Sequence, residues 1–199
     1  LGSQNVILRS VKPPDDLVSN QRTRISNYGL TWEDYERVVD TFPWVQNAVP
    51  VRNIVQEVRF EEHVLNPRIL ATTWDYRNVT GRMMHRGRFI SQSDDRLVAN
   101  VCVLGYEVAR FLFPARQAVG QRIKIGPEYF NVVGVMYPRV ALGDDPPEAG
   151  VDVTSEVLIP LTTGRRWFGD ITVKIRSGSR EMEDVELHEI VAAVKRPEY

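Results

Sequence analysis

The stretch from residue 98 to residue 136 constrains the fold most, because strand, turn and helix signals follow one another closely there. Residues 98–104 are mostly apolar, which predicts a buried strand. Gly105 permits the turn that follows, and the apolar spacing of residues 106–113 predicts a short helix. Pro114 cannot continue that helix and sets its end.

A β-hairpin is expected directly after this helix. Residues 121–125 alternate polar and apolar side chains, and residues 129–136 are again mostly apolar, with the turn signal Gly126-Pro127 between them. Helix 106–113 should pack on the hairpin, because leaving the apolar run Phe111–Phe113 in water would cost several kcal/mol. We therefore expect all three of these side chains to be buried.

The residues before this unit predict one helix among strands. Thr31 and Asp34 have the spacing of a capping box, and apolar residues recur at helical intervals from Trp32 to Phe42. Pro43 ends the helix. Strands are expected around it at residues 6–8, 45–60 and 65–74, which are rich in β-branched residues.

The end of the chain predicts two strands and a final helix. The strands are expected at residues 156–161 and 170–175, and the helix at about 181–195. Acidic residues near the start of this last segment and basic residues at its end suit the helix dipole. Its apolar residues recur at intervals of three and four, as one face of a helix requires: Leu187, Ile190, Val191 and Val194.

Together these elements predict an α/β (α+β) fold with two lobes. The two ends of the chain carry similar patterns of strands and a helix, so residues 4–80 and 153–199 are expected to form one lobe between them. Residues 81–152 would then be a second α/β lobe inserted into the first. The proline-rich, acidic stretch 138–152 is expected to be a loop.

Composition excludes some classes of partner. The 199 residues carry a net charge of −1, whereas nucleic-acid-binding domains usually have a strong basic excess. No apolar stretch approaches the ~20 residues of a membrane helix, and no signal peptide precedes the first strand. Taken literally, this describes a soluble cytosolic protein. The start, Leu1-Gly2-Ser3, resembles the remnant of a cleaved expression tag, and flanking membrane helices could have been cut away.

No catalytic, cofactor-binding or metal site is predicted. His63, His85 and His188 are far apart in the sequence and lack the spacing of metal ligands. Cys102, the only cysteine, lies in an apolar run and is expected to be a small buried side chain rather than a nucleophile. Neither a nucleophile elbow nor a phosphate-binding loop occurs. The acidic residues within 138–152 lack the spacing of a calcium loop and are expected to be solvated.

One short segment leaves two interpretations open. Trp167 and Phe168 follow Arg165 and Arg166, and exposed aromatic residues beside arginines are typical of protein interfaces. Alternatively, one or both aromatic side chains pack beneath a loop formed by residues 162–169. We prefer the second interpretation on the sequence alone.

Several short motifs occur in the order seen in one family of transporter domains. They are Leu30–Tyr35 followed by Phe42–Val45, then Gly87-Arg88-Phe89 and Val103-Leu104-Gly105, and finally Ile159–Thr163. In this order the chain resembles the extracytoplasmic core domain of MacB-like ABC transporter permeases, the group that includes LolC- and FtsX-type proteins. The resemblance spans nearly the whole chain, although the proline-rich acidic loop matches no pattern of the family.

The resemblance implies a part of a membrane machine. The lobe built from both chain ends would be the family's Porter-like subdomain, and the inserted lobe its Sabre-like subdomain. The domain would lie on the periplasmic side of the bacterial inner membrane, between the first two membrane helices of the permease. Its partners would be a cytoplasmic ATPase subunit reached through those helices, a second permease copy, and a periplasmic adaptor or effector. It would transmit ATP-driven motion in export or efflux, with any ATPase activity in another subunit or domain.

Two other functions stay open at this point. An FtsX-like regulatory scaffold would control a cell-wall enzyme instead of exporting a substrate. A soluble α/β enzyme would need a pocket with converging polar side chains. The permease interpretation makes a geometric demand, since both chain ends must meet one membrane face. Gln4–Leu8 should therefore lie beside Val194–Pro197, with both ends directed away from the middle lobe.

Overall fold

The computed structural model describes residues 4–11, 25–138, 155–169, 171–176 and 179–194. The strands of the main sheet are β1 (Gln4–Arg9), β3 (Val45–Ile54), β4 (Val58–Phe60), β5 (His63–Leu65), β6 (Arg68–Thr72), β7 (Met84–Gly87), β8 (Val101–Leu104), β9 (Arg122–Ile125), β10 (Glu128–Met136), β11 (Glu156–Pro160) and β14 (Glu189–Val194). A small sheet contains β2 (Ile25–Asn27), β12 (Ile171–Arg176) and β13 (Ser179–Asp184). The helices are α1 (Trp32–Thr41), α2 (Tyr76–Thr80), α3 (Gln92–Arg96), α4 (Tyr106–Leu112) and α5 (Leu161–Phe168).

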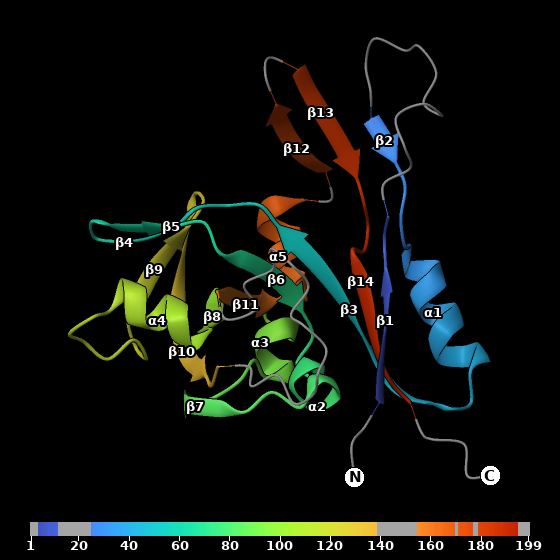
Figure 1. Ribbon diagram of the computed structural model, residues 1–199, viewed down its shortest axis with the longest axis horizontal. Coiled ribbons are helices and arrows are strands. Elements are labelled where there is room, and N and C mark those ends of the chain that lie inside the picture. Colours follow the sequence, from blue (N-terminus) through green and yellow to red (C-terminus); the bar gives the residue numbers. More distant parts are fainter. Residues whose placement is uncertain (1–3, 12–24, 139–154, 170, 177–178, 195–199) are drawn as a thin grey trace, which may run out of the picture.

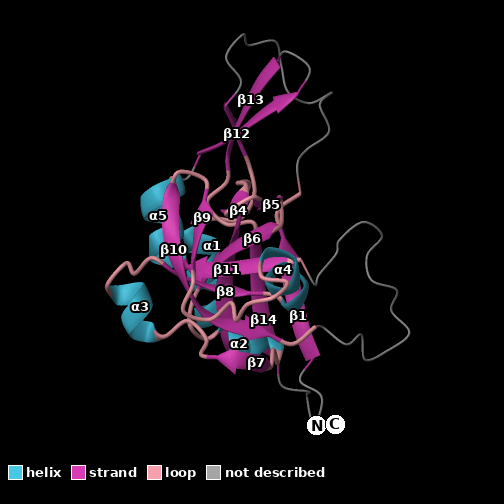
Figure 2. Ribbon diagram, turned by 90° about the vertical axis from the view of Figure 1, so that its left-hand side faces the viewer, coloured by secondary structure: helices cyan, strands magenta, loops and turns pink. Residues whose placement is uncertain are grey.

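The main sheet is continuous and mixed (Figure 1). Its order is β1-β14-β3-β6-β11-β8-β10-β9-β4-β5, and β7 pairs with β10. β11 is parallel to β6 but antiparallel to β8, so it joins strands from the two ends of the chain to strands from its middle. The small sheet projects from one end of the molecule (Figure 2). The predicted α/β fold class is confirmed.

The first helix begins and ends where its sequence predicts. The Asp34 amide donates to the Thr31 hydroxyl at 3.2 Å, and the Thr31 amide donates to the Asp34 carboxylate at 3.0 Å. These bonds complete the capping box. The bond from the Thr31 backbone, followed by one that the Thr31 hydroxyl donates to the same carboxylate, lowers the pKa of Asp34. The helix ends at Thr41, two residues before Pro43. α1 then packs on β3 beside a buried cluster of β3 and β14 residues and their neighbour Leu187.

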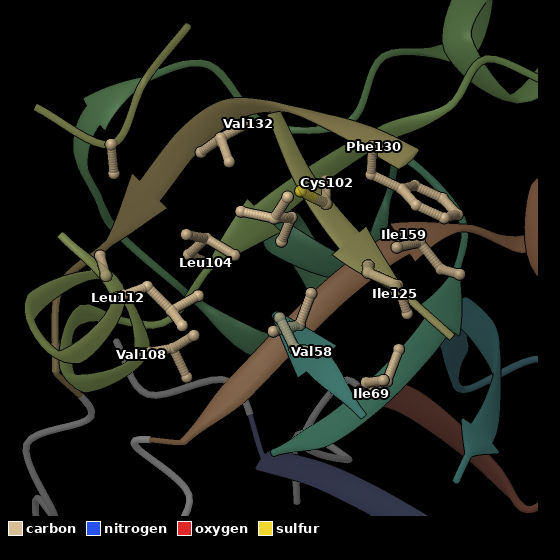
Figure 3. Packing of buried hydrophobic residues seen from close by; sticks show 14 of the residues in the cluster. Val58, Ile69, Cys102, Leu104, Val108, Leu112, Ile125, Phe130, Val132 and Ile159 are labelled. Carbon is tan, nitrogen blue, oxygen red and sulfur yellow. The ribbon is translucent and has the colours of Figure 1, made fainter. Parts of the chain in front are cut away.

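The segment from residue 98 to residue 136 forms the predicted unit around one apolar core (Figure 3). β8 is wholly buried and parallel to β10, which makes a hairpin with β9. Val108 and Leu112 of α4 contact the core, and Phe113 is also buried. The prediction was wrong for Phe111, which is 47% exposed and lies edge-on to the His63 ring. The buried face of α4 consists of Val108, Ala109 and Leu112, and Phe111 lies at the margin of this face.

The same core crosses the boundaries that the sequence suggested between two lobes. Ile69 of β6 and Ile159 of β11 lie in one cluster with Leu104 of β8 and Phe130 of β10. The division into residues 4–80, 81–152 and 153–199 stays a prediction. Excising residues 85–148 and measuring whether the remainder unfolds cooperatively would test it.

The predicted final helix is wrong. Residues 179–184 and 189–194 are strands β13 and β14, and β14 lies between β1 and β3 in the main sheet. Residues 190–193 are all buried, as expected for a strand covered on both faces. A continuous apolar run satisfies a helical spacing by coincidence, and the β-branched Ile190, Val191 and Val194 favour the strand. His188 precedes this strand and is half-buried.

The segment after β11 is helix α5 and not the expected loop. It begins after Pro160, which occupies the N-cap, and ends before Gly169, whose φ is 61°. A Cβ on Gly164 would lie 2.5 Å from the Cβ of Ala71. Glycine at this position therefore allows α5 to pack directly on β6.

Cys102 is buried, as its sequence context predicts, and this has a chemical consequence. Its side chain has no exposed surface, and burial raises the pKa of the thiol. The unreactive protonated form therefore dominates at mildly alkaline pH. We expect the folded protein to resist a colorimetric disulfide reagent, and one thiol to react once guanidinium chloride unfolds the chain. Rapid reaction of the folded protein would contradict this prediction.

Candidate functional site

Both ends of the described chain lie on neighbouring strands at one end of the main sheet. β1 is antiparallel to β14, with Gln4 opposite Val194, and Val194 is also opposite Val45 of β3. β1 therefore begins where β14 ends. In Figure 1, β1, β14 and β3 lie toward one edge of the main sheet, and β8, β9 and β10 lie toward the other edge. The expected approach of Gln4–Leu8 to the chain end is confirmed as far as Val194, and Pro197 lies outside the described residues.

A chain of ion pairs links these terminal strands to the middle of the sheet. Glu189 of β14 lies 3.6 Å from Arg9 of β1 and 2.5 Å from Arg68 of β6. Arg68 also donates to Asn53 of β3 at 3.3 Å. The Glu189 side chain is only 13% exposed, so water screens these contacts less than it screens surface ion pairs. These contacts tie together four adjacent strands.

A second, deeper ion pair involves the next strand, β11. Glu156 of β11 stands opposite Arg68 in the sheet and accepts a hydrogen bond from Arg82 at 2.5 Å. The two side chains are 3% and 8% exposed. Burial, and then the charge of Glu156, raises the pKa of the adjacent Tyr76 to about 12, so this phenol stays neutral. Arg82 lies just after α2, so the pair connects the middle of the chain to a strand from its end.

Sequence analysis missed this network. Arg68, Glu156 and Glu189 are each the first residue of a strand, directly before an apolar run. A lone charge at the start of a buried strand was the one available signal. Which charges meet depends on strand order, and strand order joins residues more than one hundred positions apart.

The described residues that sequence analysis considered for metal binding form no common site. Within the described ranges, no group of three or more His, Cys, Asp and Glu side chains could hold a metal ion. His63 contacts the ring of Phe111, whereas His85 contacts the rings of Tyr106 and Tyr137. The acidic loop lies outside the described residues from position 139 onward. Among the described helices, none is long and apolar enough to cross a membrane.

Of the two aromatic residues at the end of α5, Phe168 packs against the core and Trp167 is exposed. Phe168 is partly buried and its ring stacks on Phe130, with centroids 6.4 Å apart. Trp167 remains 41% exposed, and its Nε1 donates to the side-chain oxygen of Asn100 at 2.8 Å. The indole is therefore fixed in orientation while its ring is accessible from solvent.

Comparison with known families decides what kind of domain has this geometry. The family model described as the MacB-like periplasmic core domain matches residues 2–186. The chain belongs to this family.

Curated relatives of this MacB-like domain are transport proteins. The macrolide export ATP-binding/permease protein MacB of Azoarcus sp. is 31% identical over 167 residues, covering 81% of this chain and 24% of the relative. The protein of the same name from Wolinella succinogenes is 26% identical over 200 residues, covering 97% of this chain and 29% of the relative. The chain thus spans about a quarter of the length of these relatives.

Solved structures share the fold at low sequence identity. The periplasmic region of MacB from Actinobacillus actinomycetemcomitans has a TM-score of 0.63 at 14% identity, covering 98% of this chain and 76% of that one. The extracellular domain of the noncanonic ABC-type transporter YknZ from Gram-positive bacteria has a TM-score of 0.65 at 15% identity, covering 96% and 85%. At such identities the likeness shows the fold alone.

Proposed function

We propose that this MacB-like domain is the periplasmic part of an ABC transporter permease subunit in the bacterial inner membrane. Its role is to transmit ATP-driven motion to a periplasmic partner or substrate during export or efflux. The pairing of β1 with β14 carries the proposal, because it brings both ends of the domain to one end of the main sheet. A domain inserted between two membrane helices needs this arrangement, since both helices emerge from the same membrane face.

The partners follow from this position. An ABC ATPase in the cytoplasm acts on the domain through the two membrane helices, and a second permease copy stands beside it. A periplasmic adaptor or effector protein receives the motion. The domain performs no chemical step of its own in this proposal, and ATP is hydrolysed elsewhere in the transporter. The names of the curated relatives, which combine ATP binding with a permease, support this assignment.

The main sheet supplies a continuous route for motion. β1 pairs with β14, and the pairing then continues through β3, β6 and β11 to β8, so a displacement of the chain ends acts on β8 through backbone hydrogen bonds. The ion pairs from Arg9 through Glu189 to Arg68 join β1, β14 and β6 of this route, and the pair between Glu156 and Arg82 joins β11 to the segment after α2. Strands joined in both ways are expected to move as one rigid body.

A flexible insertion at the chain ends tests this proposal. In the full-length permease, a Gly-Gly-Ser linker before Gln4 and another after Val194 would interrupt the stiff connection to the membrane helices. We expect ATP hydrolysis to remain within about twofold of the unmodified protein, because the linkers do not touch the ATPase. The ATP-dependent change in distance between spin labels on Arg110→Cys of the two permease copies should disappear.

The matched control carries the same linker between Gly126 and Pro127, in the turn of the β9–β10 hairpin. This insertion should leave the distance change intact. Buried Cys102 is not expected to take up label. A distance change that survives the linkers at the chain ends would contradict transmission through the sheet. Thermal unfolding of the isolated domain with each insertion verifies that the fold is retained.

A further inference from the structure

An exposed patch of apolar and basic side chains lies where α3 and α5 meet. We call it the α3–α5 patch, and it consists of Arg96, Leu97, Val98, Arg166 and Trp167. Leu97 is 78% exposed, Val98 38% and Trp167 41%, so three large apolar side chains face solvent together. Such clusters, when basic residues surround them, are typical of surfaces that bind another protein.

The patch is held rigidly by hydrogen bonds between its two segments. The Thr162 hydroxyl donates to the Asp95 carbonyl oxygen, and the Thr162 amide donates to the Asp95 carboxylate at 3.1 Å. At the other end of α5, the bond from Trp167 to Asn100 fixes the indole. A surface that is already ordered loses little conformational entropy when a partner binds.

The backbone of the patch is strained. Val98 has a φ of 51°, a conformation that β-branched residues rarely adopt. Backbone bonds on either side hold this turn, from the Leu97 amide to Ser93 and from the Ala99 amide to Asp94, both at 2.9 Å. The turn leaves Leu97 exposed to solvent. Glycine at position 98 would relieve the backbone strain, but the chain has valine there. Backbone strain of this kind concentrates at functional sites.

The charge of the patch is not neutralised by its neighbours. Arg96 and Arg166 are exposed and have no ion pair among the described residues. The nearby Asp94 carboxylate accepts two hydrogen bonds from Arg88, at 2.5 and 3.0 Å, and Asp95 is bound by α5. Two cationic side chains therefore border the apolar surface and remain available to carboxylates of a partner.

We propose that the α3–α5 patch docks an acidic amphipathic segment of a periplasmic partner protein. Leu97 and Trp167 would contact its apolar face, and Arg96 and Arg166 would pair with its carboxylates. The proposal rests on the proposed function, in which a periplasmic protein receives the motion. In Figure 2, α3 and α5 lie on the opposite side of the view from β1.

Two synthetic peptides test the proposal on the isolated domain. Both carry the same leucine face on a helical scaffold, and their flanking residues are glutamate in one and lysine in the other. Calorimetry gives the affinities, and NMR follows the indole N–H of Trp167 and the methyl groups of Leu97. We expect the glutamate peptide to bind at least about tenfold more tightly and to perturb these signals. Equal affinities, or perturbations confined to other surfaces, would overturn the proposal.

Matched variants distinguish binding at the α3–α5 patch from binding at other exposed aromatic side chains. Trp167→Ala and Leu97→Ser should each weaken the glutamate peptide about tenfold, whereas Trp74→Ala, at a tryptophan that is 40% exposed, should not. Arg96→Glu combined with Arg166→Glu should transfer the preference to the lysine peptide. Vesicles of phosphatidylglycerol that bind through Trp167 more tightly than the glutamate peptide would instead identify a lipid surface. None of these outcomes depends on the linker experiment, so docking and transmission can fail separately.

Discussion

Replacing Glu156 with leucine is expected to destabilise the isolated domain by about 3–5 kcal/mol, because the change leaves the Arg82 guanidinium buried without its counter-charge. Arg82 is 8% exposed, and its Nε and Nη1 atoms already lack hydrogen-bond partners within the described structure. The substitution would remove the carboxylate that pairs with this cation in the described part of the chain. Urea unfolding, followed by circular dichroism, measures the change in the free energy of unfolding.

Two variants control for this result. Combining Glu156→Leu with Arg82→Met should recover most of the lost stability, since an apolar pair replaces a buried ionic one. Arg116→Gln breaks the ion pair between Arg116 and Glu61, whose side chains are 61% and 55% exposed, respectively. This variant should lower the free energy of unfolding by less than about 1 kcal/mol. A loss below about 1 kcal/mol for Glu156→Leu alone would show that the buried pair contributes no more than a surface pair.

A second large effect is expected from Gly87→Ala at the end of β7. A Cβ at this position would lie 2.2 Å from the carbonyl oxygen of Val133 and 2.9 Å from the Cα of Gly134, both in β10. Both contacts are backbone atoms in the middle of a strand, so neither can move aside easily. We expect a loss of about 3–5 kcal/mol, from the positive φ and from the overlap together.

Gly81→Ala provides the matched control. Gly81 has a φ of 66° and Gly87 a φ of 71°, so alanine meets nearly the same backbone strain at both positions. No atom lies within 4 Å of a Cβ built at Gly81. We therefore expect a loss of about 1–2 kcal/mol there. Similar denaturation midpoints for the two variants would mean that the contact between β7 and β10 relaxes without cost.

The parts of the fold that the sequence predicted are those set by local chemistry. Thr31 and Asp34 cap α1 through atoms three residues apart, and Pro43 and Pro114 block helices wherever the chain goes next. The hairpin β9–β10 depends on the turn at Gly126-Pro127 and on strands beside it. None of these features needs a partner from elsewhere in the chain.

The errors concern segments whose structure depends on distant neighbours. Residues 189–194 become a strand because β1 and β3 lie on either side of them, and their spacing alone suits a helix equally well. The buried ion pairs are similar, since Arg68 meets Glu189 across 121 positions. Trp167 could be assigned to a surface only after α5 was placed, because the sequence shows composition but not exposure.

The neighbouring positions of β1 and β14 also determine when the sheet can form. Gln4 pairs with Val194, so the first strand waits for almost the whole domain to leave the ribosome. At typical bacterial and eukaryotic synthesis rates this delay is roughly 10–40 s. Val6, Ile7 and Leu8 have no partner strand during that time, and an unpaired apolar strand is prone to pairing with other chains. Translation of the last strand is therefore the step that protects the first.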